Sequence, residues 1–407
     1  MIPEKLYMKK ILIVFLLAFA NISLSIAQET KFFDGSFIDA LSKAKAENKL
    51  LLVDCYFEGC MPCKEMETRV FPAPGIGNYL NTNFVAWKTD VFKEEEGKLV
   101  AAKYGITGFP SYIMLDGSGK VVNITIGFTS EKKFLPILQA SVADAKSGNV
   151  KNFTSSLKME FPSFYWDYRK TDHKFDKEAC YKYFDAQVDW NNEVNFILLT
   201  AMPLNEKYTE IYLSNADLFA KNYSRMMVRN KILGIMQSKA KKMAVSNDAV
   251  AFDDMKNRYK PIFADEWTRF DKIFTEVFYN ANKDYSAFVK YVKNNPAYDS
   301  DDRISFANSL MQTNKDDKAV LEALPALFLE KDNTVRGFDY NYTMAVIYFK
   351  LNQIEKAGLY VKAALKFNSK QNELANANNM LQALESPERS KIYRPIGLMR
   401  QKSLLID

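Results

Sequence analysis

The chain has few of the residues that usually cross-link small secreted folds or bind metal ions. Only four of its 407 residues are cysteine, and His173 is its one histidine. Four cysteines are too few for a disulfide framework, so hydrophobic cores must stabilise the fold. Zinc needs about four ligands, and one cysteine pair with a single distant histidine is poor support for a metal site. We therefore expect no metal and no bound cofactor.

Blocks of like charge and long apolar runs are also scarce. The net charge is +6, and the densest basic cluster, residues 238–243, is typical of a solvated helix face. This pattern gives little support to nucleic-acid binding. After residue 20, no segment is apolar and long enough to cross a bilayer.

The first residues have the pattern of a secretory signal peptide. Lys9 and Lys10 precede an apolar run at residues 11–20, and Ser25 and Ala27 stand at positions −3 and −1 of a cleavage site. The run is short for a retained anchor helix, so we favour removal of residues 1–27. The mature protein is then expected in the periplasm or outside the cell, where thiols tend to oxidise.

Strand-like and helix-like stretches alternate within residues 28–145. The apolar run at residues 50–57 is typical of a central strand buried on both faces. The order of elements predicts a mixed α/β sheet with helices on both faces. We expect helices at residues 34–49, 60–70, 94–105 and 130–142, strands at 50–57 and 83–91, and a hairpin at 109–128.

Residues 146–407 have a different composition, with little glycine and long helical periodicities. Residues 144–150 are a plausible linker before this all-α region. Small residues recur there at matching intervals, which resembles tetratricopeptide-like helical hairpins near 303–330 and 340–368. Pro325 interrupts the second helix of the earlier hairpin. The recurring residues are Ala307, Ala319 and Ala326, followed by Ala345, Ala357 and Ala364.

Two of the cysteines, Cys60 and Cys63, lie where the strand pattern gives way to a helix pattern. Thiols at positions i and i+3 of a first helical turn lie on one face, close enough to bridge. The helix N-terminus contributes about 0.3–2 kcal/mol in favour of a thiolate, which lowers a thiol pKa from about 8.5 toward ~7. Pro62 is tolerated in a first turn. The pattern predicts attack by Cys60 on a disulfide and resolution by Cys63, which we expect to lie deeper and be shielded.

The sequence VDCYFEGCMPCK, together with AAKYGITGFPSYIML, resembles the thioredoxin family. It is similar in particular to the soluble thioredoxin-like domains of thiol:disulfide interchange proteins. The resemblance covers residues 32–141 and implies that Cys60 attacks and Cys63 resolves. It also implies that Asp54 is a buried acid with a raised pKa, which takes the proton from Cys63 during resolution.

The same resemblance assigns roles to the second motif. Pro110 matches the cis-proline that faces the cysteine pair and binds substrate backbone, and Gly127 matches the glycine of the last strand. Some positions depart from the commonest pattern: Gly59 replaces a tryptophan and Met61 replaces a glycine. Phe109 places a bulky ring beside the proline. Met61, Pro62 and Phe109 are the candidate substrate-binding residues.

The direction of electron flow is predicted from what surrounds the pair. No histidine lies near it, and a proline precedes the second cysteine, as in reducing thioredoxins with potentials around −270 mV rather than about −120 mV. We predict an exported protein disulfide reductase that needs a membrane thiol as electron donor. Its helical region would bind protein partners. The alternative is a non-enzymatic scaffold protein with a redox-sensing thioredoxin-like module.

Each candidate residue also has a plainer interpretation. The cysteine pair could be a structural disulfide, and Asp54 a paired structural acid. Cys55 and Cys180 are typical of inert core thiols, although Cys180 could form an intermolecular bridge. His173 is expected in a solvated loop. The aromatic run at residues 161–168 is expected to pack at the start of the helical region, the alternative being an exposed patch that binds a partner.

Overall fold

The computed structural model describes residues 29–170, 174–313, 317–328 and 337–389, together with 393, 395 and 397. The predicted signal peptide and His173 lie outside these residues. The chain divides into two compact units between residues 232 and 233. Among the described helices, none combines the length and the apolarity needed to span a membrane.

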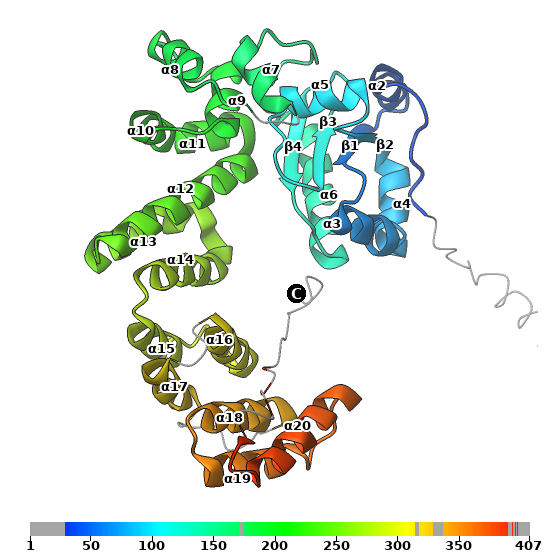
Figure 1. Cartoon of the computed structure of the whole chain (residues 1–407). Helices are drawn as coiled ribbons and strands as arrows, with labels where there is room; N and C mark the ends of the chain where they lie inside the picture. The colour runs from blue at the N-terminus through cyan, green and yellow to red at the C-terminus, as the bar shows by residue number, and fades with distance from the viewer. Residues whose placement is uncertain are drawn as a thin grey trace, which may run out of the picture. The chain divides into compact units, whose positions relative to one another are not determined.

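The first unit begins with a four-stranded mixed sheet whose strand order is β2-β1-β3-β4 (Figure 1). Strand β1 pairs in parallel with β2 and antiparallel with β3, and β3 pairs antiparallel with β4. The predicted mixed sheet with a buried central strand is confirmed, because only the last residue of β1 is partly exposed. The strands are β1 (Leu50–Tyr56), β2 (Phe84–Asp90), β3 (Ser111–Leu115) and β4 (Val121–Ile126).

Helices cover both faces of the sheet, as the order of elements predicts. On one face, Leu52 of β1 belongs to a core with Ile76 and Phe134 from two helices. On the other face, the ring of Trp87 lies 5.6 Å from that of Phe37, edge to face. Alternation along each strand therefore supplies two apolar layers from one sheet. The helices are α2 (Phe37–Ala46), α4 (Pro74–Asn83), α5 (Glu95–Lys103) and α6 (Glu131–Lys146).

The segment after β1 differs from the expected helix over residues 60–70. Helix α3 (Met61–Glu65) is short and continues as a π-helical segment, η1 (Met66–Val70), so that Cys60 is the N-cap and not part of the helix. Helix α4 was not predicted, because Pro72 and Pro74, which follow the helix expected over residues 60–70, were interpreted only as the end of that helix. Pro74 lies in the first turn of α4, where its missing N–H has no helical partner to lose.

The helical part of the first unit packs directly onto the sheet domain. Lys103 of α5 is fully buried and pairs with Glu193 of α9. Thr154 completes this contact: its hydroxyl accepts from the Lys103 ammonium at 2.9 Å, and its N–H donates to Glu193 at 2.8 Å. The predicted packing of the aromatic run is confirmed, since Phe161, Phe164 and Tyr165 are buried. The helices are α7 (Ser163–Arg169), α8 (Lys177–Asp185), α9 (Glu193–Ala201), α10 (Glu206–Ser214), α11 (Ala216–Phe219), η2 (Ala220–Ser224) and α12 (Arg225–Val245), which continues into the second unit.

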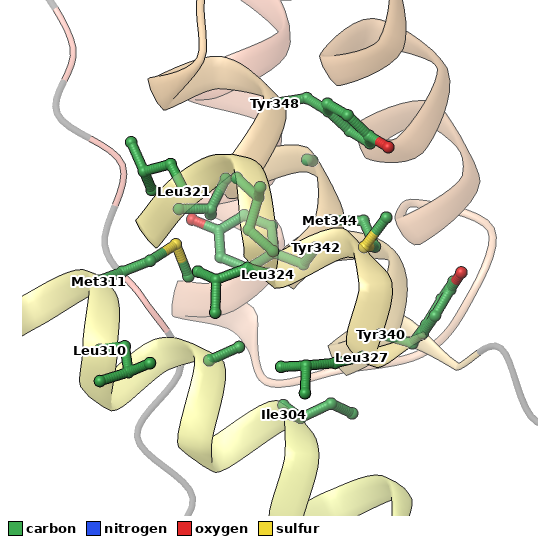
Figure 2. Close-up of a cluster of buried hydrophobic side chains, with 14 of the residues drawn as sticks. Ile304, Leu310, Met311, Leu321, Leu324, Leu327, Tyr340, Tyr342, Met344 and Tyr348 are labelled. Atoms are coloured by element: carbon green, nitrogen blue, oxygen red, sulfur yellow. The ribbon is translucent and has the colours of Figure 1, made fainter. Parts of the chain in front are cut away.

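The second unit is helical throughout its described elements, and its core is shown in Figure 2. Helices α18 and α19 form the pair that the later alanine triplet predicts, and all three of those alanines are fully buried. Pro325 lies in a 3-10 segment that follows α17, so the earlier hairpin is less regular. Assignment to a repeat family stays a prediction. The elements are α13 (Ala249–Phe263), η3 (Ala264–Glu266), α14 (Trp267–Asn282), α15 (Tyr285–Asn294), α16 (Ser300–Thr313), α17 (Lys318–Ala323), η4 (Leu324–Leu327), α18 (Phe338–Lys350), α19 (Ile354–Ala364) and α20 (Gln371–Leu384).

Glu193→Ala tests the buried ion pair. Burial already lowers the pKa of Lys103 in the wild type. Removing the Glu193 carboxylate leaves the buried ammonium without a counter-charge. We expect the free energy of unfolding to fall by about 3–5 kcal/mol. Urea denaturation of the full chain measures this loss. Glu95→Ala, which removes an exposed pair with Lys98, is the matched control and should change little. A loss no larger than that of the control would show that the pair does not stabilise the fold.

Candidate active site

The cysteine pair lies where the chain leaves β1 and begins α3. Cys60 and Cys63 form a disulfide with their Cα atoms 5.3 Å apart. Cys60 has extended backbone at the N-cap, and its sulfur accepts the N–H of Cys63 at 3.2 Å. Pro62 lies in the first turn of α3, as expected. The sulfur of Cys60 therefore lies at the helix N-terminus, where positive partial charge favours a thiolate after reduction.

The exposure of the two cysteines differs from the expected arrangement. Cys60 is only 6% exposed, whereas Cys63 is half-buried, so Cys63 is not the shielded member in this oxidised state. One physical reason is the N-cap geometry, which turns the Cys60 sulfur back over the first turn of α3. Position within the helix alone did not predict which of the two residues faces water.

Asp54 is a buried acid two residues before the end of β1. It is 7% exposed, and its Oδ1 has no hydrogen-bond partner within the described residues. Burial raises the pKa of Asp54 to about 7, against a smaller lowering by Lys88. Asp54 lines the same pocket of about 300 Å³ as Cys60, Met61 and Cys63. The carboxyl group therefore belongs to the same pocket as both cysteines and is able to change protonation near neutral pH.

Four further charged residues line this pocket and were not among the predicted residues: Glu58, Lys64, Glu67 and Lys88. Lys88 of β2 is the register partner of Asp54. Its ammonium lies 3.1 Å from a carboxylate oxygen of Glu67, whose other oxygen is 3.0 Å from the ammonium of Lys64. Lys88 is thus ion-paired with Glu67. Pairing between the expected strands at 50–57 and 83–91 could have placed Lys88 beside Asp54. This inference needs the register of the two strands, which the sequence does not give.

Pro110 follows a cis peptide bond with Phe109. Its carbonyl accepts the N–H of Gly127 at 2.7 Å, which brings together two residues that the family resemblance singled out. Gly127 has a φ of +96°, a conformation that favours glycine. We call residues 107–110 the proline loop. Phe109 connects this loop to the cysteine segment, because its ring centroid lies 5.1 Å from that of Phe57.

The comparisons with known proteins cover the part of the chain that carries this geometry. The family model described as Thioredoxin-like domain matches residues 37–141. Residues 37–141 are a thioredoxin-like domain.

Two curated relatives and one solved structure are similar to this domain. The thiol:disulfide interchange protein DsbD of Vibrio cholerae is 34% identical over 99 residues, which cover 24% of this chain and 16% of that protein. Thioredoxin-1 of Drosophila yakuba is 33% identical over 70 residues, 17% of this chain and 60% of the relative. A solution structure from Bacteroides thetaiotaomicron is 34% identical, with a TM-score of 0.27, and the match covers 28% of this chain and 95% of that one. The chain thus spans less than two thirds of the length of either curated relative.

An exposed aromatic cluster borders the cysteine pair of the thioredoxin-like domain. The rings of Phe57, Phe92 and Phe109 contact one another with centroids 5.1–5.8 Å apart. Phe92 is 54% exposed and Met61, beside Cys60, is 70% exposed. Only Phe109 and Met61 were predicted, because Phe57 and Phe92 reach the site from two separate loops.

Asp90 joins the two loops that carry Phe57 and Phe92. Its buried carboxylate accepts the backbone N–H of Glu58 at 3.0 Å, of Phe92 at 2.9 Å and of Lys93 at 3.1 Å. The Glu58 and Lys93 side chains also pair. Because several hydrogen bonds fix both loops, the aromatic cluster is held in place before any substrate arrives.

The remaining cysteines, Cys55 and Cys180, do not line the pocket of the cysteine pair. Cys55 and Cys180 are free thiols with no exposed surface, and burial raises the pKa of each. Both fit the interpretation as core residues. No group of three or more His, Cys, Asp or Glu side chains in the described ranges is arranged to hold a metal ion.

Asp54→Asn tests the burial of the acid through stability. The folded pKa is about 7 and the unfolded pKa about 3.9, so the folded state holds the extra proton between these values. Wild-type stability therefore falls as pH rises from about 4 to 7, by up to about 4 kcal/mol. We expect Asp54→Asn to be more stable than the wild type at pH 8, with the difference vanishing near pH 4. Urea midpoints at pH 4, 6 and 8 measure it.

The exposed Asp217→Asn is the control for the Asp54 experiment. It should follow the wild-type curve throughout. A difference in urea midpoint between Asp54→Asn and the wild type that stays the same at pH 4, 6 and 8 would contradict the raised pKa of Asp54.

Proposed function

We propose that the chain is an exported thiol–disulfide oxidoreductase that reduces protein disulfides through Cys60 and Cys63. One observation carries the proposal: a disulfide at a helix N-terminus shares a pocket with a buried carboxyl group whose pKa is about 7. A structural disulfide has no need of such an acid. The match to thioredoxin-like domains supports the same chemistry.

In the first step, the Cys60 thiolate attacks one sulfur of a substrate disulfide. A Cys60–substrate bond forms, and the second substrate sulfur leaves as a thiolate that takes a proton from water. Pro110 is proposed to hold the substrate backbone during this step, with Met61, Pro62 and Phe109 beside it. The N-terminus of α3 stabilises the attacking thiolate.

In the second step, Cys63 resolves the mixed disulfide. Its thiol passes a proton to the Asp54 carboxylate, and the resulting thiolate attacks the Cys60 sulfur. The second substrate sulfur leaves as a thiolate that takes a proton from water, Asp54 releases its proton to the solvent, and the protein is left with the Cys60–Cys63 bond. Two electrons have moved from protein to substrate, so each cycle needs a dithiol donor.

Reduction rather than oxidation is proposed from the sequence between the cysteines. Pro62 precedes the second cysteine, and no histidine lies within the pair. This composition resembles thioredoxins with potentials around −270 mV. If residues 1–27 direct export, the donor is expected to be a membrane protein with a reactive thiol pair. The helical region would then serve protein partners.

The aromatic cluster indicates which disulfides are preferred. Apart from Asp54, the charged side chains that line the pocket are two acids and two lysines, so they leave little net charge to attract a charged segment. Met61, the residue after Cys60, and Phe92 of the aromatic cluster are exposed apolar side chains. We propose that substrates carry an aromatic or large aliphatic side chain next to the reactive cysteine.

Cys60→Ser tests the reaction. The wild-type protein, kept reduced by dithiothreitol, should accelerate insulin precipitation, and the variant should not, because serine cannot attack a disulfide. Cys180→Ala, in the helical region, should keep the activity. Equal activity of Cys60→Ser and wild type would remove the enzyme proposal and leave the scaffold alternative. Cys63→Ser should instead trap substrates on Cys60 as mixed disulfides.

Phe92→Ala tests the substrate preference. Two disulfide peptides that differ only by Phe or Ser beside one cysteine serve as substrates. We expect the wild type to favour the Phe peptide by about 10-fold in kcat/KM, and the variant to lose most of that preference. Phe367→Ala, an exposed phenylalanine of the second unit, is the control. An unchanged preference in Phe92→Ala would show that the cluster does not select substrates.

A further inference from the structure

The segment that leads into the proline loop is bonded to the helical part of the first unit. At the end of α5, the carbonyl of Ala102 accepts the hydroxyl of Tyr165 at 2.8 Å. Four residues later, the carbonyl of Ile106 accepts a guanidinium N–H of Arg169 at 2.6 Å. Both donors lie on α7, one helical turn apart. A hydrogen bond from a charged guanidinium is stronger than one between neutral groups.

The turn between those two carbonyls is packed against the same helical part. Gly105 has a φ of +58°, and a Cβ built there would lie 3.2 Å from Ile197 and 3.4 Å from Met227. Tyr104 is fully buried, with its ring 5.6 Å from that of Phe153. Side chains from outside residues 37–141 therefore surround the backbone that enters the proline loop.

We propose that α7 sets the position of the proline loop, with Arg169 as a positioning residue for substrate binding. The carbonyl that Arg169 holds belongs to Ile106, immediately before the loop. At the other end, the Pro110 carbonyl is bonded to Gly127. The loop is thus fastened on both sides, once by the sheet domain and once by the helical part. In the first half of the loop Thr107 is exposed and Gly108 has no side chain, so side-chain packing on Phe57 begins only at Phe109.

This inference gives the helical part a role in the reaction without contact with substrate. The effect of Arg169 on substrate binding rests on the proposed function, in which Pro110 binds substrate backbone. The restraint of the proline loop by Arg169 does not depend on the proposed function. Loss of the Arg169 bond should loosen the loop and weaken substrate binding. It should leave the sulfur chemistry intact, because Cys60 and Cys63 lie on a different segment.

Arg169→Ala in the full chain is the test, with hydrogen–deuterium exchange as the first measurement. We expect amides of residues 106–112 to exchange at least about fivefold faster, while those of α6 keep their wild-type rates. Arg169→Lys should restore part of the protection, because an ammonium can also donate to the carbonyl. The control is Arg269→Ala, which removes an exposed arginine of the second unit. Unchanged exchange in residues 106–112 would overturn the proposal, whatever the activity of the protein.

Kinetics provide the second measurement. We expect Arg169→Ala to raise KM for a peptide disulfide about three- to tenfold with kcat within twofold, and the reduced Cys60 to alkylate at the wild-type rate. A lower kcat with unchanged KM would indicate a loss of folded protein and overturn the positioning role. Tyr165→Phe removes only the hydroxyl bond and keeps the buried ring, so it should show a smaller effect of the same kind.

The two proposals fail in different ways. An inactive wild type would remove the proposed reaction, and hydrogen–deuterium exchange would then still decide whether Arg169 restrains the loop. An active wild type with normal KM in Arg169→Ala would remove the positioning role alone.

Discussion

The burial of β1 between β2 and β3 is the constraint on which the candidate site depends. A strand with sheet on both sides and helices on both faces is buried from its first residue to the one before its last. Asp54 must therefore hold its carboxyl group in a poorly solvated place, and its pKa rises for that reason. The strand can end only at the edge of the sheet, where the next residues begin a helix. The raised pKa of Asp54 and the position of the cysteine pair at a helix N-terminus thus both depend on the burial of β1 and on where it ends.

The parallel pairing of β1 with β2 adds the rest of the site. Both strands end at the same edge, so the loops that follow them are neighbours there. Asp90, the last residue of β2, bonds the backbone of both loops. The charge of this buried carboxylate is balanced by N–H groups rather than by a cation, which leaves the surface above it free to be aromatic.

The sequence was informative wherever a local pattern determines the structure. Period and composition predicted the central strand and the helices on both faces, and Cys55 within that strand was expected to be an inert core thiol. Local reasoning failed at Pro74, because a proline that ends one helix also suits the start of another. It also failed for Glu67 and Lys88, whose meeting depends on strand register and on a π-helical segment. Local patterns also did not predict which of Cys60 and Cys63 is more exposed, because the burial of these residues comes from tertiary contacts.

The pairing of Lys103 with Glu193 was equally hidden in the sequence. A lysine in the last turn of a predicted helix is usually solvated and placed there by the helix dipole. Its partner stands 90 residues later, in a helix of another region. Nothing in the spacing of either residue distinguishes this lysine from Lys98, one turn earlier, which is exposed.

The buried lysine has a consequence for the modularity of the protein. In a fragment that ended with α6, Lys103 would lose its counter-ion, Tyr104 would lose the ring of Phe153, and Gly105 would lose the side chains of Ile197 and Met227 that pack against it. Recombination at the end of α6 would therefore yield a poorly soluble fragment that tends to aggregate. Selection should keep the sheet and these first helices together as one inherited block.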